Sequence, residues 1–249
     1  MLEIKDLSVA YGKKTVLPPL SLALPRGSFT ALLGKNGAGK STLLSAIASL
    51  VPYTGKILVG GEDIASLSQN ERAKRVSLLP QSLKAPPITV RELVGYGRSP
   101  HLSFPYRLDG AERERVEAAL EKADMLPLAE RLLSTLSGGE RARAYIAMTV
   151  AQQSPLMLLD EPMASLDLAR EGALMRMLSS LAQEGKTVLA SMHDPSLALR
   201  YADRILILNE DGSRAFFGTR EECLAASAIE RAFSLSRHTD GDFVFFTHE

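Results

Sequence analysis

The segment GKNGAGKST, from Gly34 to Thr42, constrains the fold of this chain more than any other feature. Its glycines let the backbone wrap tightly, so that successive N–H groups can face one phosphate. The segment follows the apolar run FTALL (29–33), which predicts a buried strand, and it precedes an expected helix from about Lys40. A strand, a glycine-rich loop and a helix in this order predict a phosphate-binding P-loop rather than an ordinary glycine-rich turn.

The spacing G-x-x-x-x-G-K-[ST] gives individual positions a chemical role. We expect Lys40 to reach the outer phosphates of a nucleotide and the Ser41 hydroxyl to bind Mg²⁺. The positive end of the dipole of the following helix also favours binding of the negatively charged phosphates. The expected phosphate-binding residues are Gly34, Lys35, Asn36, Gly37, Ala38, Gly39, Lys40, Ser41 and Thr42.

A second segment, LMLLDEP (156–162), supplies acidic groups at the end of an apolar strand. Two carboxylates at that place are unfavourable unless a cation faces them. Because side chains alternate along a strand, Asp160 and Glu161 need not do the same job. We expect Asp160 to join the Mg²⁺ shell and Glu161 to act as the general base for an attacking water. The alternative is an ordinary Asp-Glu pair at a strand end.

The remaining apolar segments predict an α/β fold. LMLL, KTVLAS and RILILN read as strands, and the first two are separated by the helix LAREGALMRMLSSLAQ. This alternation predicts a parallel sheet covered on both faces. LSLAL (20–24) predicts an earlier strand, NEDGSRAFF a hairpin, TREE (219–222) a capped helix, and DFVFFTHE a small edge strand.

Residues 85–153 lack a convincing strand and contain three helical patterns, which predicts a helical subdomain inserted into the sheet-containing part. Long crossover helices are the alternative interpretation.

Composition limits the possible partners and compartment. Basic and acidic residues both number 29, so the net charge is zero, which argues against a DNA-coating role. The single cysteine, Cys223, indicates a reducing compartment. No apolar run approaches the roughly 20 residues that span a bilayer. We therefore expect a cytoplasmic protein, or one bound to a membrane from the cytoplasmic side.

The segment LSGGE (136–140) completes the set of motifs. Ser137 and Glu140 form a capping box, which predicts a helix start with free N–H groups. With the P-loop and the acidic strand, this segment makes the chain resemble the ATP-binding cassette ATPases, the nucleotide-hydrolysing subunits of ABC transporters, over almost its whole length. The resemblance implies a P-loop NTPase fold with a mostly parallel core sheet, an N-terminal antiparallel β subdomain and an inserted helical subdomain. Residues 1–249 would form one domain, with 1–84 and 154–249 as the core and 85–153 as the helical part.

The resemblance also implies roles for residues outside the P-loop. LSGGE looks like the family's signature motif, which binds the γ-phosphate of a nucleotide held by the other subunit of a head-to-tail homodimer. Its nucleotide contacts would be Ser137, Gly138, Gly139 and Glu140.

Four single residues are assigned in the same way. Tyr11 resembles the aromatic residue that stacks on adenine, although an isolated tyrosine near a turn is more often a packing residue. Gln81 resembles the glutamine that contacts Mg²⁺ and water and senses the membrane partner. Asp167 belongs to ASLD (164–167), a segment that resembles the loop that crosses the dimer interface. His193 resembles the switch histidine at the γ-phosphate.

Three positions depart from the family pattern. Lys35 stands where proline is common, and Met163 stands where threonine is usual. Ala142 replaces a common glutamine, which we expect to remove a polar contact near the nucleotide of the facing subunit.

The segment TVRELVGYGRSPH (89–101) resembles importers of metal chelates: ferric siderophores, haem and cobalamin. The resemblance implies ATP and Mg²⁺ as ligands, membrane permease subunits, an external substrate-binding protein, no nucleic acid, and a place on the cytoplasmic face of a bacterial inner membrane. Alternatives are importers of other solutes, an exporter or lipoprotein-release ATPase, a soluble cassette ATPase that acts on ribosomes or DNA, and another P-loop enzyme such as a small-molecule kinase.

Overall fold

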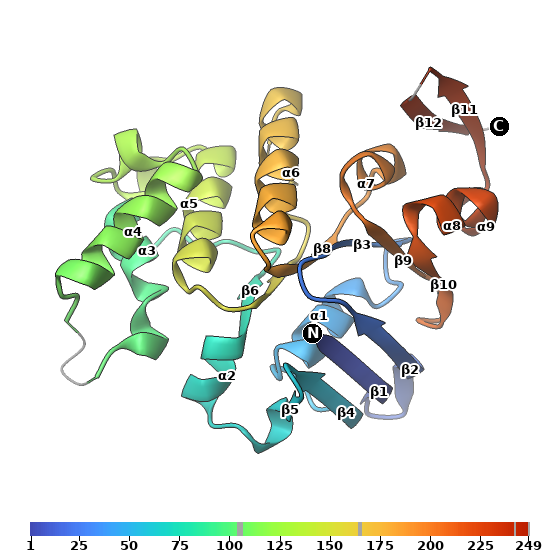
Figure 1. Cartoon of the computed structure of the whole chain (residues 1–249), viewed down its shortest axis with the longest axis horizontal. Coiled ribbons are helices and arrows are strands. Elements are labelled where there is room, and N and C mark those ends of the chain that lie inside the picture. The colour runs from blue at the N-terminus through green and yellow to red at the C-terminus, as the bar shows by residue number, and fades with distance from the viewer. Residues whose placement is uncertain (104–106, 164–165, 242, 249) are drawn as a thin grey trace.

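The structure is a computed structural model, and it describes residues 1–103, 107–163, 166–241 and 243–248. These residues form three sheets and the helices around them. Figure 1 shows the N-terminal sheet at the lower right, a group of helices at the left and the C-terminal hairpin at the upper right. No helix among the described residues is both long enough and apolar enough to span a membrane.

The central sheet has the strand order β10-β9-β3-β8-β7-β6. Its strands β9, β3, β8, β7 and β6 run parallel, and β10 pairs antiparallel to β9 at one edge. Every residue of β3, β7 and β8 is buried, as expected for strands covered on both faces. The predicted parallel sheet is therefore confirmed. The bounds are β3 Phe29–Gly34, β6 Val76–Leu79, β7 Leu156–Leu159, β8 Thr187–Ser191, β9 Arg204–Leu208 and β10 Arg214–Thr219.

The second sheet is antiparallel and has the order β2-β1-β4-β5. The register of β1 shifts between Ile4 and Leu7, and Asp6 has a φ of 49°. This bulge explains why the apolar alternation slips by one residue in the sequence. The bounds are β1 Leu2–Tyr11, β2 Lys14–Leu24, β4 Thr54–Val59 and β5 Glu62–Asp63.

The helices that follow the core strands pack their apolar stripes against the sheet. Helix α6 buries Leu174, Leu178 and Leu181, as its spacing predicts. Helix α2 was not predicted, because none of its residues is buried and it has no apolar stripe. The bounds are α1 Lys40–Ile47, α2 Gln69–Arg75, α6 Leu168–Gln183, α7 Pro195–Tyr201, α8 Arg220–Ala225 and α9 Ala228–Phe233.

Between β6 and β7 the chain forms a group of helices, seen at the left of Figure 1. Helix α5 contacts both α3 and α4. The buried Arg98 joins the group, because its guanidinium donates to the Glu112 carboxylate and to the carbonyl of Ala151. The α-helices are α3 Val90–Tyr96, α4 Gly110–Lys122 and α5 Gly138–Ala151. Shorter 3-10 turns in the chain are Ile64–Ser66, Ser99–His101, Leu126–Leu128 and Leu133–Thr135.

The C-terminal strands β11 (Leu235–Asp240) and β12 (Phe243–His248) form a separate antiparallel pair. Strand β12 packs on α7, where the Arg200 guanidinium lies 5.2 Å from the ring centre of Phe243. An edge strand was predicted at β12, but its partner β11 was not, because β11 is largely polar and exposed.

Candidate active site

The P-loop joins β3 to α1 at the carboxyl edge of the central sheet. Helix α1 begins after Gly39, which has a φ of 89° and provides no side-chain cap. This positive φ favours glycine, and a Cβ on Gly39 would in addition lie 2.8 Å from Leu17 Cδ2, so that the leucine side chain would have to shift. The first turn of α1 also has no acidic residue. Its N–H groups and its positive dipole end can therefore face an anion.

Lys40 is buried at the floor of the loop and is satisfied by backbone oxygens. Its Nζ donates to the carbonyls of Gly34 at 2.7 Å and Lys35 at 3.3 Å. Burial lowers the pKa of Lys40, and the nearby carboxylates of Glu161 and Asp160 oppose this decrease. The ammonium group is thus close enough to both acids of the second motif to be affected by their charges.

Glu161 lies between two of the predicted site residues. His193 Nε2 is 2.7 Å from Glu161 Oε1, and Gln81 Nε2 donates to Glu161 Oε2 at 2.6 Å. These side chains come from the ends of three neighbouring strands, β6, β7 and β8. Parallel strands place their carboxyl ends at one edge of a sheet, which brings residues distant in sequence together.

Ser191 is a site residue that the sequence interpretation missed. Its hydroxyl donates to Asp160 Oδ1 at 2.8 Å and accepts from the backbone N–H of Glu161 at 2.8 Å. Ser191 is the last residue of β8, and Leu159 of β7 pairs with Ala190 just before it. A polar residue at the end of an apolar strand was the available signal.

A cleft of about 400 Å³ opens over these groups. Its lining combines the P-loop with the strand ends: Val16, Asn36, Gly37, Gly39, Lys40, Ser41, Thr42, Gln81, Glu161 and His193. The lining does not include four other predicted site residues: Gly34, Lys35, Ala38 and Asp160. Tyr11 is not in the lining either; it is 51% exposed at the end of β1.

The signature segment lies apart from this cleft. Ser137 caps α5, its hydroxyl accepts from the N–H of Glu140 at 3.3 Å, and the Glu140 carboxylate accepts from the N–H of Ser137 at 2.8 Å. The predicted capping box is therefore present. None of the signature residues Ser137, Gly138, Gly139 and Glu140 lines the cleft of its own chain.

Comparison with known proteins decides the family. The family model described as ABC transporter matches residues 17–164, which include the P-loop, the signature and the acidic strand. The chain is also 41% identical to the ferric enterobactin transport ATP-binding protein FepC of Escherichia coli (strain K12), over 93% of this chain and 86% of that protein. The chain belongs to the ABC transporter family.

Two solved structures resemble the fold of this ABC transporter protein. An inward-facing putative metal-chelate type ABC transporter has a TM-score of 0.83 and 28% identity, with 99% of this chain and 96% of that chain covered. The dimeric structure of MJ0796, a bacterial ABC transporter cassette, has a TM-score of 0.79 and 28% identity, with 88% of this chain and 99% of that chain covered. Membership of this family makes the chain an ATP-binding and ATP-hydrolysing protein.

The ASLD segment and Ala142 are two further positions that the sequence singled out. Ala164 and Ser165 are outside the described residues, whereas Asp167 caps α6 and accepts from the N–H of Arg170 at 3.0 Å. Ala142, which departs from the family pattern, is only 4% exposed. Its methyl group therefore packs within this chain, and the expected loss of a polar contact to a facing subunit stays a prediction.

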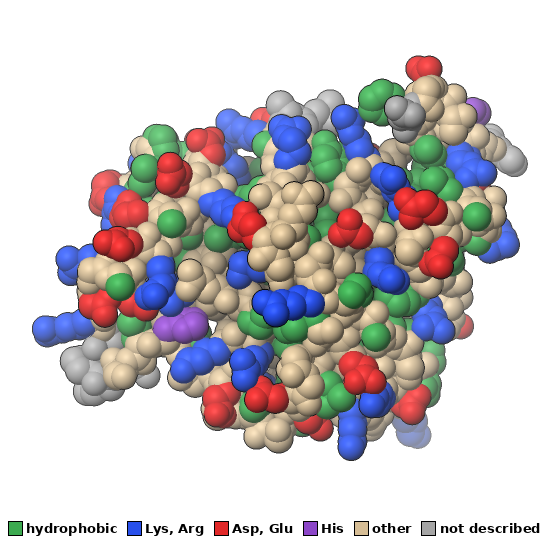
Figure 2. All heavy atoms as spheres, in the orientation of Figure 1, with side chains coloured by type: hydrophobic (Ala, Val, Ile, Leu, Met, Phe, Trp, Pro, Cys, Tyr) green, Lys and Arg blue, Asp and Glu red, His purple; other side chains and the backbone are tan. Residues whose placement is uncertain are grey.

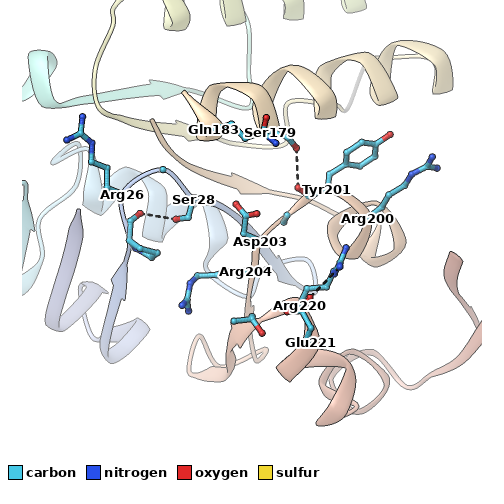
Figure 3. A pocket seen from close by; sticks show the side chains of 14 residues that line it. Arg26, Ser28, Ser179, Gln183, Arg200, Tyr201, Asp203, Arg204, Arg220 and Glu221 are labelled. Atoms are coloured by element: carbon cyan, nitrogen blue, oxygen red, sulfur yellow. Dashed lines mark hydrogen bonds and ion pairs between the residues drawn. The ribbon is translucent and has the colours of Figure 1, made fainter. Parts of the chain in front are cut away.

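A larger cavity of about 610 Å³ lies at the opposite, amino edge of the central sheet. Figure 3 shows its Arg26, Arg200 and Arg204 side chains pointing away from one another. Asp203 lies among them and accepts from the N–H of Phe29 at 2.7 Å. The fourth arginine of the lining, Arg220, pairs with Glu221 at 3.4 Å. Because these cations do not gather around one point, the smaller cleft is the better candidate for the phosphate site.

Proposed function

We propose that this protein is the ATPase subunit of an importer that takes up a metal chelate (a ferric siderophore, haem or cobalamin) through a membrane permease. ATP hydrolysis is supported by one observation: Lys40, Glu161 and His193 all line the same cleft. The likeness to FepC and to the metal-chelate type transporter supports the choice of cargo.

The nucleotide phosphates would lie along the P-loop. Backbone N–H groups of residues 34–42 and the start of α1 would hold the phosphate oxygens, and Lys40 would exchange its carbonyl partners for the outer phosphates. Tyr11, which is exposed at the end of β1, is available to stack on adenine.

The residues at the cleft fit a Mg²⁺ ion bound with the nucleotide. Ser41, Gln81 and Asp160 offer a hydroxyl, an amide oxygen and a carboxylate, the oxygen donors that Mg²⁺ prefers. Asp160 Oδ1 accepts from Ser191, and no described residue donates to its Oδ2, which is therefore free to face a cation. The bound ion would supply charge neutralisation at the phosphates.

Hydrolysis requires a water to attack the γ-phosphorus as the bond to the bridging oxygen of ADP breaks. Glu161 is placed to accept the proton of that water, since its carboxylate lies in the cleft beside the P-loop. Gln81 and His193, which both contact Glu161, can orient this carboxylate and the water and, in the case of His193, contact the γ-phosphate. The products are ADP and inorganic phosphate.

The complete site would include a second copy of the chain. Helix α5 begins with a glycine-containing turn suited to phosphate, yet it does not line the cleft of its own chain. A head-to-tail homodimer would place Ser137 to Glu140 of one subunit over the nucleotide of the other, with Asp167 at the interface. The dimeric cassette structure of MJ0796 supports this arrangement. ATP would drive closure because it binds the closed dimer more tightly than the open one.

The other partners follow from transport. The helical segment 85–153 and Gln81 would contact the permease, and an external substrate-binding protein would deliver the chelate. With these partners, the protein would act on the cytoplasmic face of a bacterial inner membrane. Figure 2 shows acidic and basic side chains interspersed on one face, and the net charge is zero. Both observations argue against nucleic acid as a partner, because nucleic-acid-binding proteins usually carry a basic patch.

Uptake in vesicles tests this proposal. The chain would be purified with the membrane protein that accompanies it, reconstituted with ATP, and offered a ferric siderophore, haem or cobalamin. We expect one chelate to accumulate with the native chain and not with Glu161→Gln. ATP-dependent efflux, or hydrolysis without movement of any chelate, would instead favour an exporter or a soluble ATPase.

A further inference from the structure

The hydroxyl of Ser191 joins the two acidic residues of the cleft at the same time. It donates to Asp160 Oδ1 and accepts from the N–H of Glu161, both at 2.8 Å. Ser191 has 0% exposed surface, so solvent does not compete for either hydrogen bond. A hydroxyl that donates once and accepts once in this way has little freedom to rotate.

The backbone of Glu161 gives the second hydrogen bond its importance. Glu161 has a φ of 50°, in the left-handed region that residues other than glycine seldom adopt. Such a conformation persists where the surrounding structure holds it. The hydrogen bond from its N–H to Ser191 stabilises this conformation. The conformation in turn sets the direction in which the Glu161 side chain leaves the strand, toward Gln81 and His193.

The first hydrogen bond acts on Asp160. The Ser191 hydroxyl occupies Oδ1, and among the described residues nothing donates to Oδ2. Fixing one carboxylate oxygen in this way fixes the direction of the other. A partner of this kind behind a metal ligand orients it and tunes the affinity for the ion.

We infer that Ser191 is a positioning residue for ATP hydrolysis, which holds Asp160 in the orientation for Mg²⁺ and the peptide of Glu161 in the orientation for general-base catalysis. The inference rests on the proposed roles of Asp160 and Glu161. Ser191 also lies two residues before His193 on the same segment, so the end of β8 contacts both the backbone N–H and the side chain of Glu161.

The test compares Ser191→Ala with the conservative variant Ser191→Thr and with Thr187→Val. Thr187 is also fully buried, lies at the other end of β8, and donates its hydroxyl to the Pro25 carbonyl at 3.2 Å. Thr187→Val therefore removes a partly buried hydrogen bond from the same strand without touching the cleft. Three quantities would be measured: kcat, the KM for ATP, and the Mg²⁺ concentration that half-saturates binding of a fluorescent ATP analogue.

For Ser191→Ala we expect kcat to fall, or the half-saturating Mg²⁺ concentration to rise, by about 10–100-fold, with Ser191→Thr recovering most of the loss. Thr187→Val should lower stability and leave all three quantities native. If Ser191→Ala does not fold, Ser191→Cys takes its place, because a thiol keeps the shape but donates weakly. The inference is overturned if the alanine or cysteine variant behaves like Thr187→Val.

These measurements separate the inference from the proposed function. They use hydrolysis and Mg²⁺ binding by the purified chain, so they hold whatever solute is transported. If no chelate is taken up but Ser191→Ala has the expected effect, only the assignment of cargo fails. If Asp160→Asn and Glu161→Gln hydrolyse ATP normally, the proposed roles of both acids fail, and the inference about Ser191 fails with them.

Discussion

His193 Nε2 lies 2.7 Å from Glu161 Oε1. The other oxygen of the same carboxylate accepts from Gln81 at 2.6 Å, so Glu161 is held from both sides by residues of neighbouring strands. A general base needs its carboxylate in one position relative to the attacking water. The two contacts supply that orientation, and they predict that changes at Glu161 act on turnover more than on nucleotide binding.

Glu161→Gln should bind ATP and fail to turn it over. The amide keeps the size of the side chain but cannot accept the proton, and general-base catalysis typically contributes about 10²–10⁴-fold to a rate. We expect phosphate release to fall by that order and the dimer to persist with ATP, as measured by a phosphate assay and by light scattering after gel filtration. Native turnover by this variant would rule out Glu161 as the base.

The shared-site arrangement predicts complementation between two inactive variants. Lys40→Ala removes the phosphate contact of the P-loop, and Ser137→Arg blocks the signature. In a mixed dimer, one site combines the intact P-loop of one subunit with the intact signature of the other. Each variant alone should be inactive, and the mixture should recover part of the native ATPase rate. Hydrolysis at the native rate by either variant alone contradicts the shared site.

The local motifs could be predicted from the sequence because each is continuous along the chain. GKNGAGKST and LMLLDEP carry their strand, loop and acidic residues within a few positions, and the structure places them together as expected. The contacts of Lys40 with the P-loop carbonyls likewise depend on residues only five or six positions away.

What could not be predicted depends on the register of neighbouring strands or lacks an apolar pattern. Ser191 contacts Asp160 only because Leu159 pairs with Ala190, and the two contacting residues are 31 positions apart. Helix α2 has no buried residue, so hydrophobic periodicity gives no signal, and only its capping box marks it.

Cys223 provides a pH-dependent measure of the fold around α8. Burial, with a further contribution from Glu230, raises the pKa of its thiol from 9.0 to about 11. As the pH rises from 9.0 toward about 11, the unfolded chain loses this proton before the folded chain does, so the free energy of unfolding decreases. Below that range the thiol is protonated in both states and the effect is absent.

Urea unfolding at several pH values across that range would compare the native chain with Cys223→Ala. We expect the free energy of unfolding of the variant to fall less steeply with rising pH than that of the native chain. The cavity that alanine leaves lowers the stability of the variant by the same amount at every pH and does not change this slope. Near neutral pH, iodoacetamide should modify Cys223 slowly in the folded protein and rapidly in urea. Parallel stability curves for the two proteins would show that the thiol titrates normally in the fold.

Gly97 and Gly95 form a matched pair in the helical part of the chain. A Cβ on Gly97 would lie 2.3 Å from the Met148 carbonyl of α5, a backbone atom, whereas a Cβ on Gly95 would meet only Leu108 Cδ1 at 3.4 Å. Gly97→Ala must therefore separate α3 from α5, and overpacking of this kind costs about 1–3 kcal/mol. Gly95→Ala should be neutral or stabilising, since alanine favours helix by about 1 kcal/mol over glycine.

Urea unfolding measures this difference directly, and the ATPase rate extends it to function. Helix α5 begins at the signature and also packs against Gly97, so a shift of α5 moves Ser137 relative to the facing subunit in the proposed dimer. We therefore expect Gly97→Ala to lower both stability and turnover, while Gly95→Ala preserves turnover. Equal stability of the two variants would mean that α3 and α5 are not in close contact in solution. The need for glycine at position 97 could then not be explained by the close approach of the Met148 carbonyl.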